Sequence, residues 1–437
     1  MKLCVIGAGY VGLVTAACFA NLGNEVICVD NDKKKVTALD KGKIPFYEPS
    51  LGELVVHNRT AGRLAFSNKL EEAINASQVI FISVGTPAKA NGEADISAVT
   101  SVAGSIAGVL QRLSEKNGRK FKVIVNKSTV PVGMGDIVTG LLIKRGVRQN
   151  RFAVVSNPEF LREGSAVADF TRPSRIIIGA DNNRAFNVIT ELYRPLNAHI
   201  IFTSVKSAEL IKYVANAFLA TKISFINEIA NICDRIDLDV GEIADAVGLD
   251  KRIGRDFMDA GLGFGGSCLP KDLKALIHLS RQNSYAPKLL TATLEINNTR
   301  VKNLVRKMAK VLKGLNNKTI ALLGLSFKPE TDDLREAPAL KLVAALKKMK
   351  AKVRCYDPAH KGKQVAGVKV FSDVYEALKG TDAIVLATEW AEFSELDFDK
   401  IKKIVKCPIL FDCRNVYDPK KIKESGFLYF GIGRGRG

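Results

Sequence analysis

The sequence predicts an α/β protein made of two doubly wound domains that are joined by a long central helix. Three observations support this prediction. A strand, a glycine-rich turn, a helix and a second strand follow one another over residues 2–30. A similar strand–helix–strand order returns over residues 318–357. Between them, residues 206–237 have a helical pattern that no glycine or proline interrupts.

The expected division of the chain follows from these elements. The length of 437 residues suggests two or three domains. We expect a dinucleotide-binding domain of the Rossmann type at residues 1–203, a helical region at residues 204–300 and a second, Rossmann-like domain at residues 301–437.

The first turn is Gly7-Ala8-Gly9-Tyr10-Val11-Gly12, directly after an apolar strand at residues 2–6. In this context its three glycines predict a dinucleotide site, because they allow a tight turn, the approach of a pyrophosphate and close packing of helix on strand. Asp30 closes the next strand. A carboxylate there accepts both ribose hydroxyls and repels a 2′-phosphate, so NAD is favoured over NADP. Lys35 is near enough to assist, although a solvated lysine on a helix face fits the sequence nearly as well.

Polar side chains follow the further predicted strands of this domain. They are Thr86 after residues 79–84, Thr129 after residues 123–125, and Glu159 and Glu163 after residues 152–156. Ligands of doubly wound sheets bind outside the carboxyl ends of the strands, so we expect these side chains at a site. Glu159 and Glu163 are four residues apart and would face the same way on a helical turn. The alternatives are a capping role for Thr129 and a solvated helix for the two carboxylates.

A single thiol lies in a glycine-rich stretch at residues 261–272. Cys268 comes just before Pro270, which suits the first turn of a helix, and an apolar run follows at helical spacing. A thiol beside a helix N-terminus, with Lys271 three residues on, should have a lowered pKa and more thiolate at neutral pH. Most cysteines are small core residues, but glycine-rich loops make poor cores. We therefore interpret Cys268 as a nucleophile.

The predicted central helix has two polar residues on a mostly apolar stretch. Lys212 and Asn216 are four residues apart and share one face. We expect them at a site, whereas the alternative is a lysine that extends to solvent beside an ordinary asparagine. A helix of this length should connect domains or pair with its copy in a dimer.

The second half repeats the pattern of the first half with a different turn. Its strands are predicted at residues 319–324 and 353–356, and the second of them ends at Asp357, as Asp30 ends its own strand. The glycine turn is replaced by a polar segment that includes Lys328 and Arg335. We expect this half to bind another nucleotide, with the two cations as phosphate ligands.

Composition limits the classes of protein that remain. Hydrophobic residues make up 47% and charged residues 25%, which is ordinary for a globular protein, and no apolar run approaches the length of a bilayer span. The chain begins directly with a strand, so we expect no signal peptide. Eight cysteines without metal-type spacing fit reduced thiols in the cytoplasm, and we expect no metal. The net charge of +20 would attract phosphates, but we see no nucleic-acid motif.

Together these segments resemble the UDP-glucose/GDP-mannose dehydrogenase family over essentially the whole chain. The resemblance rests on motifs in the same order: GAGYVG at 7–12, STVPVG at 128–133, NPEFLREG at 157–164, the lysine–asparagine helix, GFGGSCLPKD at 263–272 and FKPETDDLREAP at 327–338. It implies oxidation of a sugar C6 alcohol to a carboxylate with two NAD per sugar. The Cys268 thiol would capture the aldehyde as a thiohemiacetal, which then becomes a thioester.

The resemblance also implies roles for individual residues. Lys212 would stabilise the oxyanion, Asn216 and Asp272 would hold it or a water, Glu159 would be the acid/base of hydrolysis, and Thr129 would lie near the water and nicotinamide. Cofactor contacts would come from Gly7, Gly9, Val11, Gly12, Asp30, Lys35, Thr86, Thr129, Glu163, Lys271 and Arg335. Sugar-nucleotide contacts would come from Glu159, Phe160, Leu161, Arg162, Lys212, Asn216, Phe257, Met258, Asp259, Ala260, Gly261, Gly265 and Lys328, with Arg252 reaching the substrate of a neighbouring subunit. The family position at Phe257 is often tyrosine, so a hydroxyl contact is absent here.

Several alternatives stay open from the sequence. The expected reaction converts UDP-glucose into UDP-glucuronate, and the motifs at 157–164 and 327–338 favour that branch. Oxidation of GDP-mannose or another nucleotide sugar would use the same catalytic residues. A nucleotide-sugar sensor without catalysis is a different class, which the joint presence of Cys268, Lys212 and Glu159 disfavours. A homodimer through the central helix is expected, and partnership with nucleic acid or membrane is not.

Overall fold

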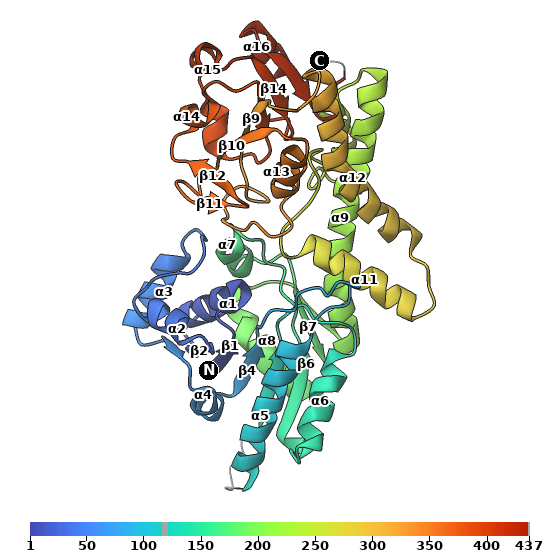
Figure 1. The fold of residues 1–437 in the computed structure, drawn as a ribbon. Coiled ribbons are helices and arrows are strands. Elements are labelled where there is room, and N and C mark those ends of the chain that lie inside the picture. The colour runs from blue at the N-terminus through green and yellow to red at the C-terminus, as the bar shows by residue number, and fades with distance from the viewer. Residues whose placement is uncertain (116–120, 436–437) are drawn as a thin grey trace. The chain divides into compact units, whose positions relative to one another are not determined.

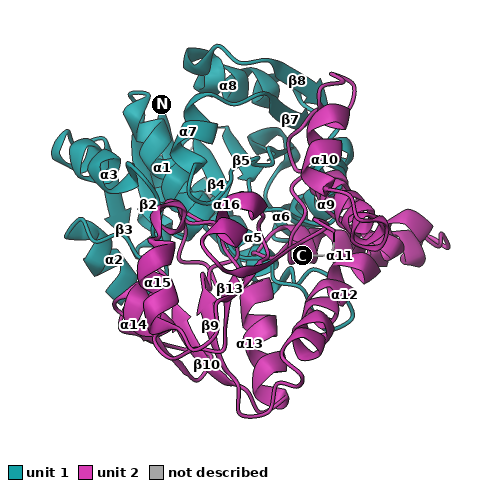
Figure 2. Cartoon of the chain, turned by 90° about the horizontal axis from the view of Figure 1, so that it is seen from above, with its two compact units in different colours: residues 1–215 teal, residues 216–437 magenta. Residues whose placement is uncertain are grey.

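The computed structural model describes residues 1–115 and 121–435. The chain divides into two compact units, Met1–Ala215 and Asn216–Gly437, which Figure 2 distinguishes by colour. Each unit has its own sheet, and each is described by itself below.

The sheet of the first unit has the strand order β3-β2-β1-β4-β5-β6-β7-β8. Its first six strands have the order expected of a dinucleotide-binding fold, and they are parallel. The strands are β1 Lys2–Ile6, β2 Glu25–Val29, β3 Leu64–Ser67, β4 Val79–Ile82, β5 Lys122–Asn126, β6 Phe152–Ser156, β7 Ile176–Ala180 and β8 Ile200–Thr203. The helices are α1 Tyr10–Asn21, α2 Lys33–Asp40, α3 Leu51–Thr60, α4 Leu70–Ala76, α5 Ser97–Glu115, α6 Met134–Lys144, α7 Ala166–Thr171 and α8 Asn183–Tyr193, with short 3-10 turns at Gln149–Arg151 and Arg194–Leu196.

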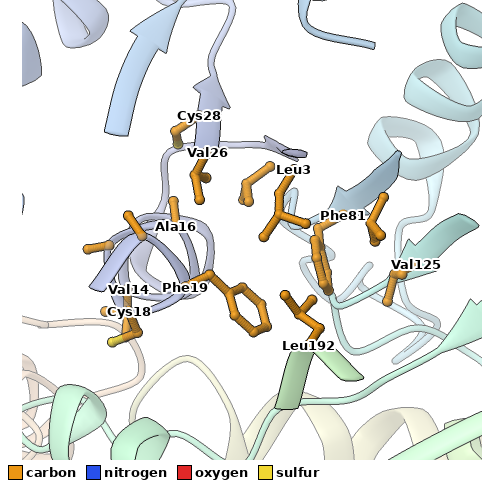
Figure 3. Close-up of a cluster of buried hydrophobic side chains, with 14 of the residues drawn as sticks. Leu3, Val14, Ala16, Cys18, Phe19, Val26, Cys28, Phe81, Val125 and Leu192 are labelled. Carbon is orange, nitrogen blue, oxygen red and sulfur yellow. The ribbon is translucent and has the colours of Figure 1, made fainter. Parts of the chain in front are cut away.

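The core of the first unit forms where α1 packs against the sheet. Nine consecutive residues of α1, from Gly12 to Ala20, are buried, so this helix is apolar on all sides. Figure 3 shows Phe19 of α1 near Phe81 of β4 and Leu192 of α8. The Phe19 and Phe81 rings lie 5.3 Å apart. Burial of each such ring contributes about 2–3 kcal/mol, which holds the C-terminal turns of α1 against the sheet.

Helix α9, Val205–Ile236, is the long central helix that the sequence predicts (Figure 1). It ends where Asp237 adopts a left-handed backbone with φ of 61°. Its first turns belong to the first unit and the rest to the second. Its buried side packs in both units, and a stripe of apolar residues on it is exposed, as described below.

The second unit has the strand order β11-β12-β10-β9-β13-β14-β15. Apart from the short antiparallel β11, this order repeats that of the first unit. The strands are β9 Thr319–Leu323, β10 Lys352–Tyr356, β11 Gln364–Val365, β12 Val368–Phe371, β13 Ala383–Leu386, β14 Ile409–Asp412 and β15 Leu428–Gly431. The helices are α10 Val240–Gly248, α11 Leu269–Gln282, α12 Lys288–Val311, α13 Pro338–Lys348, α14 Val374–Leu378, α15 Phe398–Ile404 and α16 Pro419–Glu424, with a 3-10 turn at Ala391–Glu395.

The predicted fold class is confirmed, with differences at particular elements. The apolar run after the glycine turn predicts a helix from about Leu13, but α1 already begins at Tyr10, because Gly9 serves as its N-cap. Strand β7 pairs antiparallel with β6 and parallel with β8, so these two strands extend the sheet beyond what the sequence predicted. Helix α8 lies between them in the chain. None of the helices in the described part of the chain combines the length and apolar character that a bilayer span requires.

Candidate active site

The glycine turn of the first unit is built to receive a pyrophosphate. Gly7 has a φ of +102°, and a Cβ at Gly12 would lie 1.8 Å from the Gly7 carbonyl oxygen. Both positions therefore require glycine. At Gly9 a Cβ would meet nothing within 4 Å, and Gly9 gives α1 no side-chain cap. The open space at Gly9 and the uncapped N-terminus of α1 fit a bound dinucleotide phosphate.

Asp30 ties the end of β2 to this turn. Its Oδ2 accepts hydrogen bonds from the Ala8 amide at 2.9 Å and from Lys35 Nζ at 3.0 Å, and its Oδ1 accepts from the Asp32 amide. Burial acts to raise the pKa of Asp30, but these three hydrogen bonds outweigh it and hold the pKa below its usual value. The structure thus places a permanent carboxylate at the position expected for a ribose contact, with Lys35 beside it.

Thr86 and Thr129 come together at the carboxyl ends of β4 and β5. The Thr86 hydroxyl donates to the carbonyl oxygen of Thr129 at 2.7 Å. Thr86 is buried and Thr129 is half-buried. Thr86 therefore holds the backbone of the Thr129 segment, in addition to any contact with a cofactor.

Glu159 and Lys212 form a buried ion pair. Lys212 Nζ lies 3.1 Å from Glu159 Oε1, and each side chain is about 95% hidden, with relative exposures of 4% and 5%. The Lys212 ammonium also lies 5.3 Å from the centre of the Phe160 ring. Burial makes such a pair sensitive to the loss of either partner. Two residues that the sequence assigned to chemistry thus meet directly, although α9 and the loop after β6 are far apart in sequence.

The helical turn that was considered for residues 159–163 does not form. Residues 157–162 are irregular, and α7 begins only at Ala166. The Glu159 Oε2 accepts a hydrogen bond from the Leu161 amide at 2.6 Å, which closes a local turn instead. Glu163 is buried, Phe160 and Leu161 are half-buried, and Arg162 is exposed.

A carboxylate that the sequence did not single out holds the next part of this loop. Glu48 accepts hydrogen bonds from the amides of Gly164 and Ala166, both at 2.7 Å, and from the hydroxyl of Tyr10. Burial and the Glu48 carboxylate raise the pKa of Tyr10, so it remains a neutral donor. Nothing in the local sequence marks Glu48, because its backbone partners lie more than a hundred residues away.

In the second unit, Cys268 lies where the sequence predicted it, at the N-cap of α11. The helix begins at Leu269 with Pro270 in its first turn, and the Asp272 amide donates to the Cys268 carbonyl oxygen at 2.9 Å. Cys268 is half-buried, and its Sγ lies 3.4 Å from the Ser267 hydroxyl. The lowered pKa of this thiol stays a prediction from its helix N-terminus.

Asp272 joins two other predicted residues. Its Oδ2 accepts from Asn216 Nδ2 at 2.6 Å, and its Oδ1 pairs with Lys271 Nζ. Asp272 is fully buried and Asn216 nearly so. Because Asn216 is on α9 and Asp272 is on α11, this contact holds the first turn of α11, which Cys268 caps, against α9.

The loop that leads to Cys268 is held by two asparagines that the sequence analysis missed. Asn227 of α9 accepts from the Gly261 amide at 2.8 Å. Asn297 of α12 accepts from the Phe264 amide at 2.7 Å and donates to the Phe264 carbonyl at 3.1 Å. These contacts satisfy backbone groups in a loop without regular structure. Asparagine on a long helix gives no sequence signal for such a role.

The remaining predicted residues of the second unit lie in or beside the same loops. Phe257 has a left-handed backbone with φ of 65°, Met258 and Ala260 are buried, Asp259 pairs with Arg255, and a Cβ at Gly265 would lie 2.6 Å from the Glu336 carbonyl oxygen. Arg252 is exposed and pairs with Asp250 at 2.6 Å. Arg335 pairs with Asp333 at 2.8 Å, and Lys328 lies beside the Phe327 ring. The two predicted phosphate ligands of this unit therefore lie on one polar segment, residues 327–338.

The cysteines divide by burial. All eight are free thiols, and six of them are buried. Burial raises the pKa of Cys4, Cys18 and Cys355 to about 12. Only Cys268 and Cys407 are partly exposed. Burial thus distinguishes Cys268 from the six buried thiols.

Comparison with known proteins identifies the chain. Protein-family models of the UDP-glucose/GDP-mannose dehydrogenase family match it in three parts: the NAD binding domain over residues 1–197, the central domain over residues 206–299 and the UDP binding domain over residues 321–419. The chain belongs to this family. The expected resemblance is confirmed, and so is NAD as the cofactor.

Individual relatives are similar over the full length. The UDP-glucose 6-dehydrogenase TuaD of Bacillus subtilis is 46% identical, covering 99% of this chain and 93% of the relative. The UDP-glucose 6-dehydrogenase of Rhizobium meliloti is also 46% identical and covers 99% of this chain and all of its own length. The structure of a UDP-glucose dehydrogenase from Pyrobaculum islandicum has a TM-score of 0.89 at 35% identity, with 99% of this chain and 97% of that chain covered.

Proposed function

We propose that the chain oxidises UDP-glucose at C6 to UDP-glucuronate, with NAD as hydride acceptor in two successive oxidations. Membership of a NAD-dependent family of sugar-nucleotide dehydrogenases sets the reaction class. Relatives with 46% identity over nearly the whole chain are named as UDP-glucose 6-dehydrogenases, which favours glucose over mannose. When bound, NAD accepts one hydride in each oxidation, and the glycine turn and Asp30 would hold it.

The protein side chains would manage the covalent and proton-transfer steps. The Cys268 thiolate adds to the aldehyde carbon, and a thiohemiacetal results. Lys212 would stabilise the oxyanion, which by analogy with a single lost donor contributes about 3 kcal/mol. After the second oxidation the sugar is a thioester of Cys268. Glu159 takes a proton from water, which attacks the thioester carbon and releases the carboxylate together with the thiolate.

The observation that best supports this proposal is a half-buried Cys268 at the N-terminus of α11, one turn before the buried Asp272–Asn216 contact. Helix N-termini lower the pKa of thiols and favour the nucleophilic thiolate. A structural cysteine would have no need of this position, and six of the other seven are buried in the cores.

The test is the Cys268→Ala variant. It should bind NAD and UDP-glucose with nearly unchanged affinity but form no UDP-glucuronate, measured as NADH and as acid by chromatography. Cys413→Ala, which removes a buried thiol of the same unit, is the control and should cost stability only. Acid formation by Cys268→Ala at the wild-type rate would refute the covalent mechanism. NADH production with GDP-mannose instead of UDP-glucose would refute the substrate.

We also propose that two copies of the chain associate through α9. Six apolar residues on this helix are exposed, and successive ones are four or seven positions apart: Leu210, Val214, Phe218, Phe225, Ile232 and Ile236. Such spacing places them on one stripe, as in paired helices. Phe218 is 64% exposed, which is costly for a large apolar ring unless a partner covers it. The occupant should be a second copy, because homo-oligomers are the usual way to cover such a face.

Measurement of molar mass by light scattering tests this association. The wild-type protein should have the mass of a dimer, and Phe218→Glu with Phe225→Glu should give a monomer. Val56→Glu, which changes an exposed apolar residue on α3, is the control and should leave the mass unchanged. A monomeric wild-type protein would contradict the proposal.

We also propose a cytoplasmic location from the eight free thiols, because free thiols need the reducing conditions of that compartment.

A further inference from the structure

A second lysine lies beside the Glu159–Lys212 pair and has no assigned role. Lys127 follows the last residue of β5 and is only 4% exposed. Its Nζ donates hydrogen bonds to Asn157 Oδ1 and to the Tyr193 hydroxyl, each at 3.0 Å. The Tyr193 hydroxyl in turn donates to Asn157 Oδ1 at 2.6 Å. Within residues 1–115 and 121–435 no carboxylate forms a direct ion pair with Lys127, so its charge is buried among neutral partners.

Lys127 and the ion pair belong to one cluster of charges. Asn157, which accepts from Lys127, follows the last residue of β6 and lies two residues before Glu159. The charges that act on Lys127 are the Glu159 carboxylate and the Lys212 ammonium. Tyr193 of α8 completes the surroundings, and burial raises its pKa, so it stays neutral at physiological pH. The cluster therefore contains one carboxylate and two amines from three different elements.

Burial lowers the pKa of Lys127 to about 7; Lys212 acts in the same direction, and Glu159 opposes it. A group with this pKa changes its charge within the physiological range. Each change of charge on Lys127 alters the electrostatic field at Glu159. Coulomb interactions between buried groups are stronger than in water.

We propose that Lys127 is a positioning residue whose protonation controls Glu159, the base of thioester hydrolysis. A protonated Lys127 favours the ionised carboxylate and makes it less able to take a proton from water. A neutral Lys127 removes that field and leaves Glu159 a stronger base. The inference rests on the role of Glu159 in the proposed function. It adds the group that sets the working pH of that step.

The same strand supplies a matched control. Lys122 begins β5 as Lys127 follows its end, and it is also 4% exposed. Its Nζ donates to the carbonyl oxygens of Ile74 at 2.9 Å, of Asn75 at 3.1 Å and of Ser77. About 16 Å of strand separates the two lysines. Removal of Lys122 therefore removes a buried lysine without touching the Glu159–Lys212 cluster.

The experiment measures acid release from the Cys268 thioester against pH for three variants and the wild type. The wild-type rate should rise with an inflection near pH 7. In Lys127→Met the inflection near pH 7 should be absent, because the group that titrates there is gone, and the rate below pH 7 should stay near its high-pH value. Lys127→Arg keeps a cation at every pH, and it should hydrolyse the thioester about tenfold more slowly above pH 8 with no inflection near 7. Lys122→Met should lower the melting temperature and keep the wild-type inflection.

The outcomes separate this inference from the proposed function. A wild-type protein that makes no acid from UDP-glucose would overturn the function and the inference with it. A wild-type protein that makes acid, together with a Lys127→Met variant that keeps the wild-type inflection, would overturn the inference alone. If Lys127→Met does not fold, Lys127→Arg decides, because an unchanged inflection in that variant would equally exclude a role for the Lys127 proton.

Discussion

Both units end their second strand with an aspartate, and the two aspartates make the same first contact. In the first unit Asp30 Oδ2 accepts from the Ala8 amide of the glycine turn. In the second unit Asp357 Oδ2 accepts from the amides of Leu325 and Ser326, at 2.7 and 3.1 Å, in the turn after β9. The second oxygen of each carboxylate also accepts from the amide two residues on, that of Asp32 or of Ala359. The two carboxylates differ in their side-chain partner: Asp30 contacts Lys35 Nζ at 3.0 Å, whereas Asp357 contacts His360 Nδ1 at 2.9 Å.

The turns between the strand and the helix differ more than the aspartates do. Only residues 7–9 separate β1 from α1, whereas residues 324–337 separate β9 from α13. The short turn brings the α1 N-terminus directly to the sheet, and the long one inserts a polar segment there. Asp357 is fully buried, while Asp30 is 8% exposed. An aspartate after the second strand therefore ties strand to turn in both units, and only the one beside the short glycine turn keeps some exposure.

Gly12→Ala should have the largest effect among changes that break this comparison. The new Cβ would lie 1.8 Å from the Gly7 carbonyl oxygen, a clash that only movement of α1 relieves. We expect a loss of about 3 kcal/mol or more in the free energy of unfolding, measured by urea denaturation, and loss of NAD binding. Gly9→Ala is the control, because its Cβ meets nothing. Gly9→Ala should leave the free energy of unfolding unchanged and weaken NAD binding. If Gly12→Ala and Gly9→Ala were equally stable, the steric role of Gly12 would be contradicted.

Asp357→Asn should come next and should affect stability but not cofactor use. Removal of a buried carboxylate that binds three amides and a histidine costs about 2–3 kcal/mol at pH 7. Burial acts to raise the pKa of Asp357, but the contacts with His360, Leu325 and Ser326 outweigh it and lower the pKa below 3.8. The stabilisation by the carboxylate is thus present above about pH 4 and is lost as the pH falls through the lower, folded-state pKa. Unfolding of wild type and variant at pH 7 and pH 3 measures this difference, which should shrink at pH 3. A changed Michaelis constant for NAD would show that the second unit shares the role of the first.

Asp30→Asn should have the smallest effect on stability and should sharpen the comparison through cofactor choice. Without the charge, NAD should lose about tenfold in kcat/KM, and the ratio of NAD to NADP should fall because repulsion of a 2′-phosphate is gone. Steady-state kinetics with both cofactors measures this, with Asp32→Asn as the control on the same turn. An unchanged ratio would remove the assignment of Asp30 as the ribose ligand.

The sequence predicted what periodicity and glycine spacing determine. The order strand, glycine turn, helix and aspartate is local, so Gly7, Asp30 and the start of α11 at Cys268 could be placed from the chain alone. The predicted helix that carries Lys212 and Asn216, four residues apart, is confirmed as well, since both lie on α9. These features depend on neighbours within a few positions.

Features that depend on distant partners were not predictable in the same way. The reversal of direction at β7 depends on which strand edge the chain meets, not on the residues of β7. Glu48 and Asn297 gain their roles from backbone groups that other segments bring to them. From the sequence, Lys127 looks like a solvated lysine after a strand. Its pKa is lowered only because the fold buries it beside Tyr193 of α8. The helical turn expected at Glu159 does not form, and Glu159 Oε2 instead accepts from the Leu161 amide in a local turn.

The uneven burial of the thiols has a practical consequence for covalent chemistry. Mild electrophiles attack exposed thiolates, and six of the eight cysteines are hidden in the two cores. A Cys407→Ser variant would leave Cys268 as the one partly exposed thiol among the described residues. Titration of that variant with an alkylating agent would then count working sites in a preparation, and bound sugar nucleotide would slow the labelling. Oxidative damage to the wild-type protein would follow the same order and would stop catalysis while the fold is still intact.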